Sequence, residues 1–141
     1  DRYHMWYEGE ASDGDYTIGY ADSEDGMDWE RDSFSVLSPE DSWEHPDLFN
    51  PFVIQNETGF HMWYAGGDLF GFGSTEIGYA WSADGVEDWE RPESPVLSPG
   101  FGSWDSEDLF SPRVLITDDR PMMWFAGGNG TSVSIGLAYG E

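Results

Sequence analysis

The sequence contains no cysteine and no lysine, and its five basic residues are all arginine. Without cysteine the chain has no disulfide bonds, no thiolate metal sites and no cysteine nucleophile. Five arginines are too few to build the basic patches that bind phosphates, so the sequence predicts neither nucleic acid nor a membrane surface as partner. No apolar run approaches the roughly 18 residues of a membrane span, and residues 1–20 lack a signal-peptide pattern.

Acidic residues dominate the charge. The 141 residues include 29 Asp and Glu, which gives a net charge of −24. Such charge is common in disordered chains, but those are poor in aromatic residues, whereas this chain is 17% aromatic and has eight tryptophans. We therefore expect a folded, halophilic protein whose self-repulsion is screened by salt. The sequence leaves its localisation open between secretion and the cytoplasm of a salt-accumulating cell.

The chain repeats itself. The segment HMWYEG at 4–9 returns as HMWYAG at 61–66 and as MMWFAG at 122–127. The segment IGYA at 18–21 returns at 77–80, and as IGLA at 135–138, while VLSP at 36–39 returns at 96–99. Length differences between the copies fall in Gly- and Asp-rich stretches, which is typical of loops. A repeat of this length indicates one supersecondary unit that recurs along the chain.

Within one period the apolar runs are short and rich in aromatic and β-branched residues, which predicts strands at about 48–55, 60–65, 75–82 and 94–98. Four antiparallel strands per period are typical of a β-propeller blade. We expect an all-β propeller of about two and a half blades: the last three strands of one blade in 1–47, a complete blade in 48–107, and the first three strands of another in 108–141.

An open arc of blades exposes apolar faces and strand edges at both of its ends. We therefore expect the chain to self-associate, with a dimer favoured, into a ring of five or six blades, or to form part of a longer chain.

Several motifs together resemble those of a known superfamily. The segments FHMWYAG at 60–66, IGYAWSADG at 77–85 and WER at 89–91 are similar to the blade repeat of the five-bladed propeller glycosidases, which include arabinanase-, invertase- and mannoside-phosphorylase-like enzymes. The resemblance implies chemistry by two facing carboxylates, with a base supplied by an Asp-Pro pair at the start of an innermost strand. Here Asn50 precedes Pro51 and Ser111 precedes Pro112, and neither side chain ionises as a carboxylate does.

The inner-strand positions nevertheless supply candidate site residues. Asn50 and Ser111 are candidate ligand contacts. Asp47 and Asp108, three residues before each of them, are alternative candidate acids. Arg113 is expected to pair with Asp108 or Asp47, or to hold a polar ligand.

The loops that enter the inner strands carry Trp43 and Trp104, which are candidates to stack on a sugar ring; the alternative is packing over the top of a blade. We expect the insertion at 67–73 on the same face, where Leu69, Phe70 and Phe72 form either a ligand lid or an association patch.

Two further motifs favour structural roles. His4 and His61 share a repeat position that holds Met122 in the third copy, which indicates packed strand histidines rather than metal ligands. The pattern Ser-x-Asp-Gly-x-x-Trp at 23–29 and 82–89, longer by one residue in the second copy, is typical of a tight turn. The sequence predicts no metal site and no cofactor.

Because Asn50 and Ser111 replace the expected acids, the preferred hypothesis is a non-catalytic or structural propeller, with carbohydrate as a candidate ligand. The alternative is a glycoside hydrolase or phosphorylase that acts through paired carboxylates in the central funnel.

The charge generates a testable prediction. In dilute buffer the net charge of −24 should destabilise the fold, whereas near 1 M NaCl, where the Debye length is about 3 Å, the native structure should form fully. Circular dichroism during a salt titration measures the change. Full native structure in the absence of salt would contradict the halophilic assignment.

Overall fold

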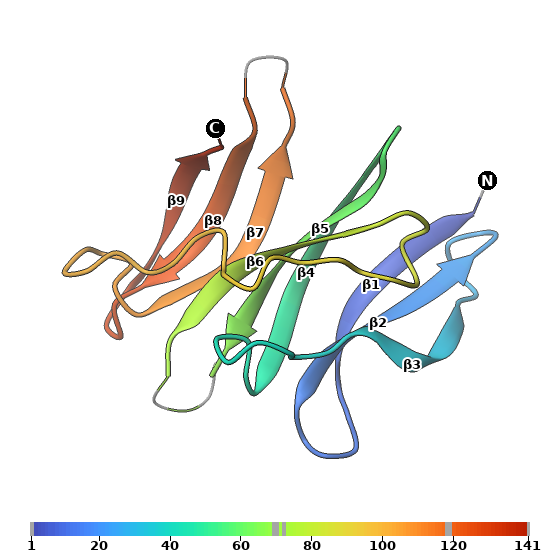
Figure 1. The fold of residues 1–141 in the computed structure, drawn as a ribbon, viewed down its shortest axis with the longest axis horizontal. Helices are drawn as coiled ribbons and strands as arrows, with labels where there is room; N and C mark the ends of the chain where they lie inside the picture. The colour runs from blue at the N-terminus through green and yellow to red at the C-terminus, as the bar shows by residue number, and fades with distance from the viewer. Residues whose placement is uncertain (1, 69–70, 72, 118–119, 141) are drawn as a thin grey trace.

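The computed structural model describes residues 2–68, 71, 73–117 and 120–140. These residues form strands and loops without an α-helix, so the described part includes no helix that would span a membrane. Figure 1 shows three neighbouring groups of strands, coloured blue, green and orange to red. The strands are β1 (Tyr3–Glu10), β2 (Tyr16–Ser23), β3 (Glu30–Leu37), β4 (Asp47–Asn56), β5 (Gly59–Gly67), β6 (Thr75–Ser82), β7 (Asp108–Leu115), β8 (Met122–Gly128) and β9 (Val133–Tyr139).

Each group is an antiparallel meander. Strands β1–β3 form the first blade, β4–β6 the second and β7–β9 the third. Only one parallel residue pair, Thr75 with Asp108, joins β6 to β7 among the described residues. The repeated motifs occupy equivalent strands, which confirms the all-β propeller blades predicted from the repeat.

The expected strand at 94–98 does not form a regular ladder. Among the described residues, the backbone pairs of residues 90–97 with β6 are the isolated bridges Ile77–Leu97 and Trp81–Glu90. Its counterpart in the first blade, β3, is a continuous strand. The second copy has Pro92 and Pro95 where β3 has Asp32 and Ser35, and proline has no N–H to donate to a ladder. The backbone pairing of the outer strand in the second blade is therefore reduced to two isolated bridges among the described residues.

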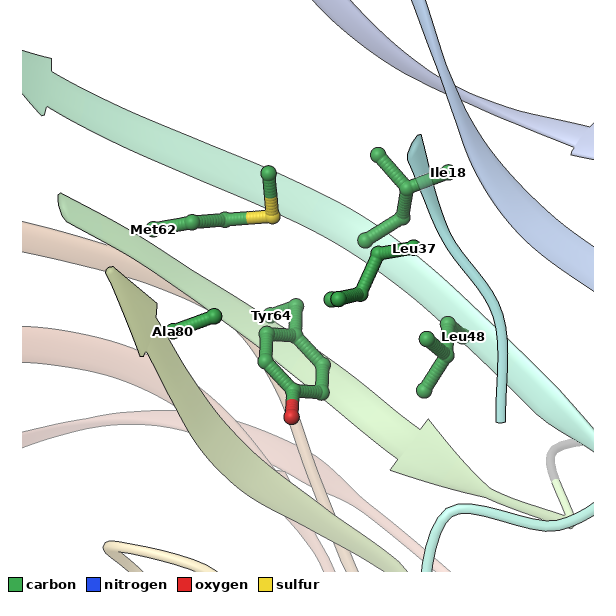
Figure 2. Packing of buried hydrophobic residues seen from close by; sticks show 6 residues of the cluster. All are labelled: Ile18, Leu37, Leu48, Met62, Tyr64 and Ala80. Atoms are coloured by element: carbon green, nitrogen blue, oxygen red, sulfur yellow. The ribbon is translucent and has the colours of Figure 1, made fainter. Parts of the chain in front are cut away.

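The blades adhere through apolar side chains between their sheets. Ile18 on β2 is fully buried in one cluster with Leu48 and Tyr64 of the second blade, and Leu37 of the first blade lies among them (Figure 2). The second interface repeats the arrangement, because Ile77 on β6 is buried with Leu109 and Phe125 of the third blade. Each interface thus places an isoleucine of one blade against a leucine and an aromatic ring of the next.

The two repeated histidines both lie on strands, as predicted, but only His61 is partly buried, whereas His4 is exposed. The His4 Nδ1 atom is 2.6 Å from the Tyr20 hydroxyl, and the His61 Nδ1 atom is 2.7 Å from the Tyr79 hydroxyl. Burial lowers the pKa of His61. Each histidine is therefore held by a tyrosine on the neighbouring strand.

The Ser-x-Asp-Gly motifs form turns, as predicted. In the second blade the Asp84 carboxylate accepts hydrogen bonds from the backbone N–H groups of Val86 and Glu87, both at 2.9 Å. Gly85 has a φ of 80°, which L side chains rarely adopt. Its carbonyl accepts a 2.7 Å hydrogen bond from Trp6 of the first blade, so this turn also fastens two blades together.

The turn carboxylate provides a pH-dependent prediction. Hydrogen bonds from the N–H groups of Glu87 and Val86 lower the pKa of Asp84. Because a lowered pKa stabilises the fold only while the group is ionised, the contribution should be present above about pH 4 and decline as the pH falls through the folded pKa. Asp84→Ala should cost about 1 kcal/mol near pH 7 and progressively less in acid, measured by urea unfolding. Glu87→Ala, which removes an exposed charge from the same turn, is the control. An effect of Asp84→Ala that does not change with pH would contradict the assignment.

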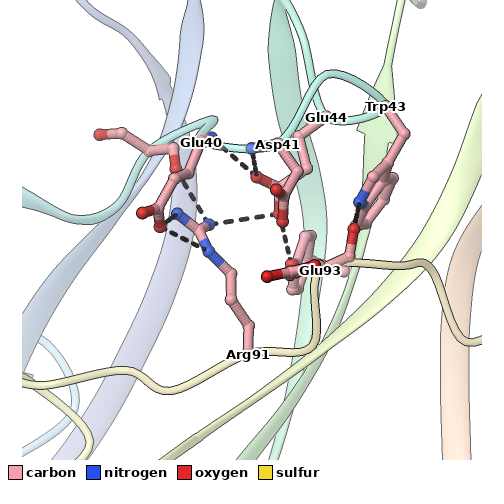
Figure 3. A network of polar contacts seen from close by, with 8 residues as sticks. Glu40, Asp41, Trp43, Glu44, Arg91 and Glu93 are labelled. Carbon is pink, nitrogen blue, oxygen red and sulfur yellow. Dashed lines mark hydrogen bonds and ion pairs between the residues drawn. The ribbon is translucent and has the colours of Figure 1, made fainter.

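A buried ionic network fixes the loop that enters β4. The Glu44 side chain is fully buried, and it accepts hydrogen bonds from the Tyr64 hydroxyl at 2.6 Å and from Arg91 at 3.2 Å (Figure 3). Arg91 also contacts Glu40 at 2.7 Å and the Ser38 carbonyl at 3.0 Å. Burial, followed by the hydrogen bond to Glu44, raises the pKa of Tyr64 far above its ordinary range, so the hydroxyl remains a donor. The network ties the loop to the outer edge of the second blade.

Removing the arginine from this network should destabilise the protein strongly. Arg91→Ala leaves the buried Glu44 carboxylate without its cation, and breaking a buried ion pair costs about 3 kcal/mol or more. Arg31 occupies the equivalent repeat position but is exposed, so Arg31→Ala makes the same change of charge without this loss and should cost less than about 0.5 kcal/mol. Urea unfolding of both variants at high salt measures the difference. Equal losses of unfolding free energy in the two variants would show that the Arg91–Glu44 ion pair does not cause the destabilisation.

Candidate functional site

The innermost strands β4 and β7 each contain a bulge at the position where the related enzymes are expected to carry an acid. Asn50 and Ser111 have φ angles of 51° and 53°, in the left-handed region. The register with the neighbouring strand shifts between Phe49 and Phe52 in β4, and in the same way in β7. Asn tolerates this backbone conformation better than most residues. The bulges turn both side chains out of the regular alternation of their strands.

These two side chains meet each other and a carboxylate from the first blade. The Asn50 backbone N–H donates to Glu8 Oε2 at 2.8 Å, and Asn50 Nδ2 donates to the same oxygen at 3.3 Å. On its other side, Asn50 Oδ1 accepts from the Ser111 N–H at 3.1 Å and from the Ser111 hydroxyl at 2.9 Å. The three residues form a continuous hydrogen-bonded line across three blades, here called the Glu8–Asn50–Ser111 line.

The line explains the departure from Asp-Pro in chemical terms. A carboxylate at position 50 would place two negative charges against each other, because Glu8 already faces that position. An amide instead donates to Glu8 and accepts from Ser111 at the same time. Both bonds to Glu8 end on Oε2, so Oε1 meets no donor among the described residues and remains an open acceptor on an exposed side chain.

Glu8 was not among the residues singled out from the sequence. The signal was present, since the equivalent positions of the other two copies hold Ala65 and Ala126. A charged residue that appears in only one copy of an apolar repeat position indicates a role outside the packing of the blade.

Arg113 differs from one expectation. It pairs with neither Asp108 nor Asp47, because the ion pairs among the described residues that involve arginine are those of Arg2 and Arg91. The Arg113 side chain is exposed, lies with its Cζ atom 5.4 Å from the centre of the Phe52 ring, and donates to its neighbouring Pro112 carbonyl at 2.6 Å. The cation–π contact with the adjacent blade has taken the place of the expected carboxylate partner.

Asp47 and Asp108 lie where their strands begin, and both contact the preceding blade. The Tyr16 backbone N–H donates to Asp47 Oδ1 at 2.9 Å, and the hydroxyl of Thr75, which holds the repeat position equivalent to Tyr16, donates to Asp108 Oδ1 at 3.3 Å. Asp47 is buried. These contacts give both carboxylates a structural role between blades.

The two candidate tryptophans stack on aromatic rings of the blades that their loops enter. Trp43 stacks on Tyr64 with 6.1 Å between ring centroids, and Trp104 stacks on Phe125 at 5.9 Å. Trp43 Nε1 also donates to the Glu93 carbonyl at 3.2 Å (Figure 3). Packing over the blade thus occupies one face of each ring, and 40% of Trp104 remains exposed.

The apolar residues of the inserted loop, Leu69, Phe70 and Phe72, lie outside the described residues. The Gly67 N–H, at the end of β5, donates to the Glu44 carbonyl at 3.2 Å, so this residue lies beside the segment that enters β4.

Comparisons with known proteins agree with the strand arrangement. No family model matches the chain. A β-1,2-mannobiose phosphorylase of Thermoanaerobacter sp. (strain X514) is 33% identical over 110 residues, which cover 67% of this chain and 35% of that protein. The chain therefore spans about a third of the length of this curated relative.

Solved structures show the same fold at lower identity. A family 117 glycoside hydrolase of Zobellia galactanivorans superposes with a TM-score of 0.74 at 18% identity, over 89% of this chain and 38% of that one. The β-fructofuranosidase BmSUC1 of Bombyx mori superposes with a TM-score of 0.76 at 15% identity, over 99% of this chain and 32% of that one. The chain is thus a partial β-propeller that has the fold of the five-bladed glycoside hydrolases and glycoside phosphorylases.

Proposed function

We propose that the chain supplies the sugar-binding part of a propeller of the glycoside hydrolase and phosphorylase type, and that the Glu8–Asn50–Ser111 line is its binding element. The observation that supports this is the line itself, in which three polar side chains from three blades meet at the innermost strands. Blade packing does not require them, since Glu8 and Ser111 stand at positions that differ between the copies.

The chemistry of the line suits a polyhydroxylated ligand. The open Glu8 Oε1 accepts a hydrogen bond from a sugar hydroxyl, and such charge-assisted bonds are stronger than neutral ones. The Ser111 hydroxyl donates its hydrogen bond to Asn50 Oδ1, so the lone pairs of the hydroxyl oxygen remain available to accept a hydrogen bond from a ligand. Arg113, two residues further along β7, adds an exposed guanidinium that donates to ring or hydroxyl oxygens. Glu8 and Ser111 thus offer acceptors, and Arg113 offers a donor, to a polyhydroxylated ligand.

A catalytic role is the second candidate, and Glu8 is the observation that favours it. Glycoside cleavage of the general type uses two facing carboxylates, and within the line Glu8 is the one residue that has a carboxylate. A second acid would have to come from Asp47, from Asp108 or from another part of the complete propeller. The enzymatic names of the similar proteins fit this candidate as well as they fit binding alone.

Ligand binding by the line is testable with matched glutamate variants. Calorimetry and saturation-transfer NMR in molar NaCl, with β-1,2-mannobiose and sucrose as probes, should detect binding of at least one of them. Glu8→Gln removes the charged acceptor but keeps the shape of the side chain, and it should weaken binding at least about tenfold, or about 1.4 kcal/mol. Glu57→Gln, in the exposed β4–β5 hairpin, should have no effect. The proposal fails if neither sugar binds the folded protein, or if both variants behave alike.

The variant Asn50→Asp distinguishes sugar binding alone from catalysis. The new carboxylate would face Glu8 in place of the donating amide, so it should weaken sugar binding and raise the pKa of one member of the acid pair. If binding is the whole function, no glycoside is cleaved by the wild type or by this variant. Release of sugar from a chromogenic mannoside or fructoside by either protein would establish the catalytic candidate instead.

A further inference from the structure

The Glu8–Asn50–Ser111 line uses almost all of its hydrogen-bond donors internally. The backbone N–H and one side-chain N–H of Asn50 donate to Glu8 Oε2, and the N–H and hydroxyl of Ser111 donate to Asn50 Oδ1. The line therefore offers a ligand mainly acceptors, namely Glu8 Oε1 and the lone pairs of the Ser111 hydroxyl, beside one remaining N–H of the Asn50 amide. A ligand that fits the line must bring the donors.

The chain has no cation that pairs with Glu8. It contains no lysine, and all five arginines lie in the part of the chain that the structure describes. The ion pairs among the described residues are those of Arg2 and Arg91, and Glu8 takes part in none of them. Only the neutral N–H groups of Asn50 hold the Glu8 carboxylate. Its charge is therefore uncompensated, in contrast to that of Glu44, which pairs with Arg91.

An ammonium group meets both requirements. It carries a compact positive charge and three N–H donors, and it has no acceptor. It can therefore pair with Glu8 Oε1 and keep two N–H groups for other acceptors. A hydroxyl group brings one donor and no charge, whereas a carboxylate brings a second negative charge, which Glu8 and the net charge of −24 repel. Sugars should thus bind in the order amino, neutral, acidic.

Arg113 indicates how such a ligand is oriented. Its guanidinium lies on the Ser111 side of the line, where it donates to the Pro112 carbonyl at 2.6 Å and lies 5.4 Å from the centre of the Phe52 ring. Because like charges repel, we expect the ammonium group at Glu8 and not beside Arg113. The hydroxyls and the ring oxygen of the sugar, which can accept hydrogen bonds, would face the guanidinium.

We propose that the line selects an amino sugar, a sugar that carries a protonated amine, and binds its ammonium group through Glu8 Oε1. This selectivity rests on the proposed function, because it names the class of sugar that the same line binds. The charge of Glu8, and not only its capacity to accept a hydrogen bond, then determines which sugar is preferred. The ligand supplies the cation that the chain itself does not place at Glu8.

Matched sugars test the role of the ligand charge. Glucosamine, glucose and N-acetylglucosamine share one ring, but only glucosamine carries an ammonium group, below the pKa of about 7.7 of an amino group. Ligand-observed NMR titrations in molar NaCl and moderately acidic buffer should show that glucosamine binds about fivefold more tightly than glucose, or about 1 kcal/mol. N-acetylglucosamine should resemble glucose, and glucuronic acid should bind most weakly. Equal affinities for glucosamine and glucose overturn the proposed selectivity.

Variants of the line locate the source of the preference. Glu8→Gln keeps an acceptor and the shape of the side chain but removes the charge, so it should bind glucosamine and glucose equally. Ser111→Ala removes an uncharged acceptor, so it should weaken both sugars and leave their ratio unchanged. Glu57→Gln removes the same charge from the exposed β4–β5 hairpin and should also leave the ratio unchanged. A preference for glucosamine that persists in Glu8→Gln overturns the proposed selectivity.

Failure of this selectivity and failure of the proposed function give different results. If glucosamine and glucose bind equally and Glu8→Gln weakens both, the preference for amino sugars is wrong and sugar binding by the line stands. If no sugar of either set of probes binds the folded protein, both are wrong. Near-UV circular dichroism verifies that each variant is folded.

Discussion

The contact between successive blades is the interaction on which the rest of the structure depends. A buried isoleucine of one blade packs against a leucine and an aromatic ring of the next, first as Ile18 with Leu48 and Tyr64, then again one blade later. Burial of apolar surface is the main favourable contribution to the folding free energy of a small all-β chain. The same contact fixes the angle between blades, and so it brings Glu8, Asn50 and Ser111 within hydrogen-bond reach.

Acidic residues have different roles at the surface and in the interior of the protein. Most of the described acidic residues lie in loops and turns and are at least partly exposed, so water and salt screen them. Glu44 is fully buried and requires Arg91, Tyr64 and two backbone donors. Adaptation to salt, which remains a prediction, would concern the acids in loops and turns. Glu44 is part of the fold, since an unpaired buried carboxylate would be costly in any solvent.

The repeat was sufficient to predict the blades but not every strand or contact. The bounds of β6 agree with the expected 75–82, because Gly- and Asp-rich turns punctuate the sequence there. The segment 94–98 was expected as a strand from its homology to 36–39, and the nearby Pro92 and Pro95 explain why it is not a regular one. Local pattern also missed Glu8, because its partner Asn50 is distant in sequence and the packing of the second blade on the first brings the two together.

Glu8 has a consequence for how such a protein can acquire new functions. A propeller built from copies offers each inner position several times, on blades whose packing is already complete. One copy can then carry Glu while its counterparts, Ala65 and Ala126, carry a small side chain. The scaffold stays symmetric and the ligand surface does not. Changes confined to a single copy are therefore the natural places to look for altered specificity in relatives of this chain, ahead of positions where all copies agree.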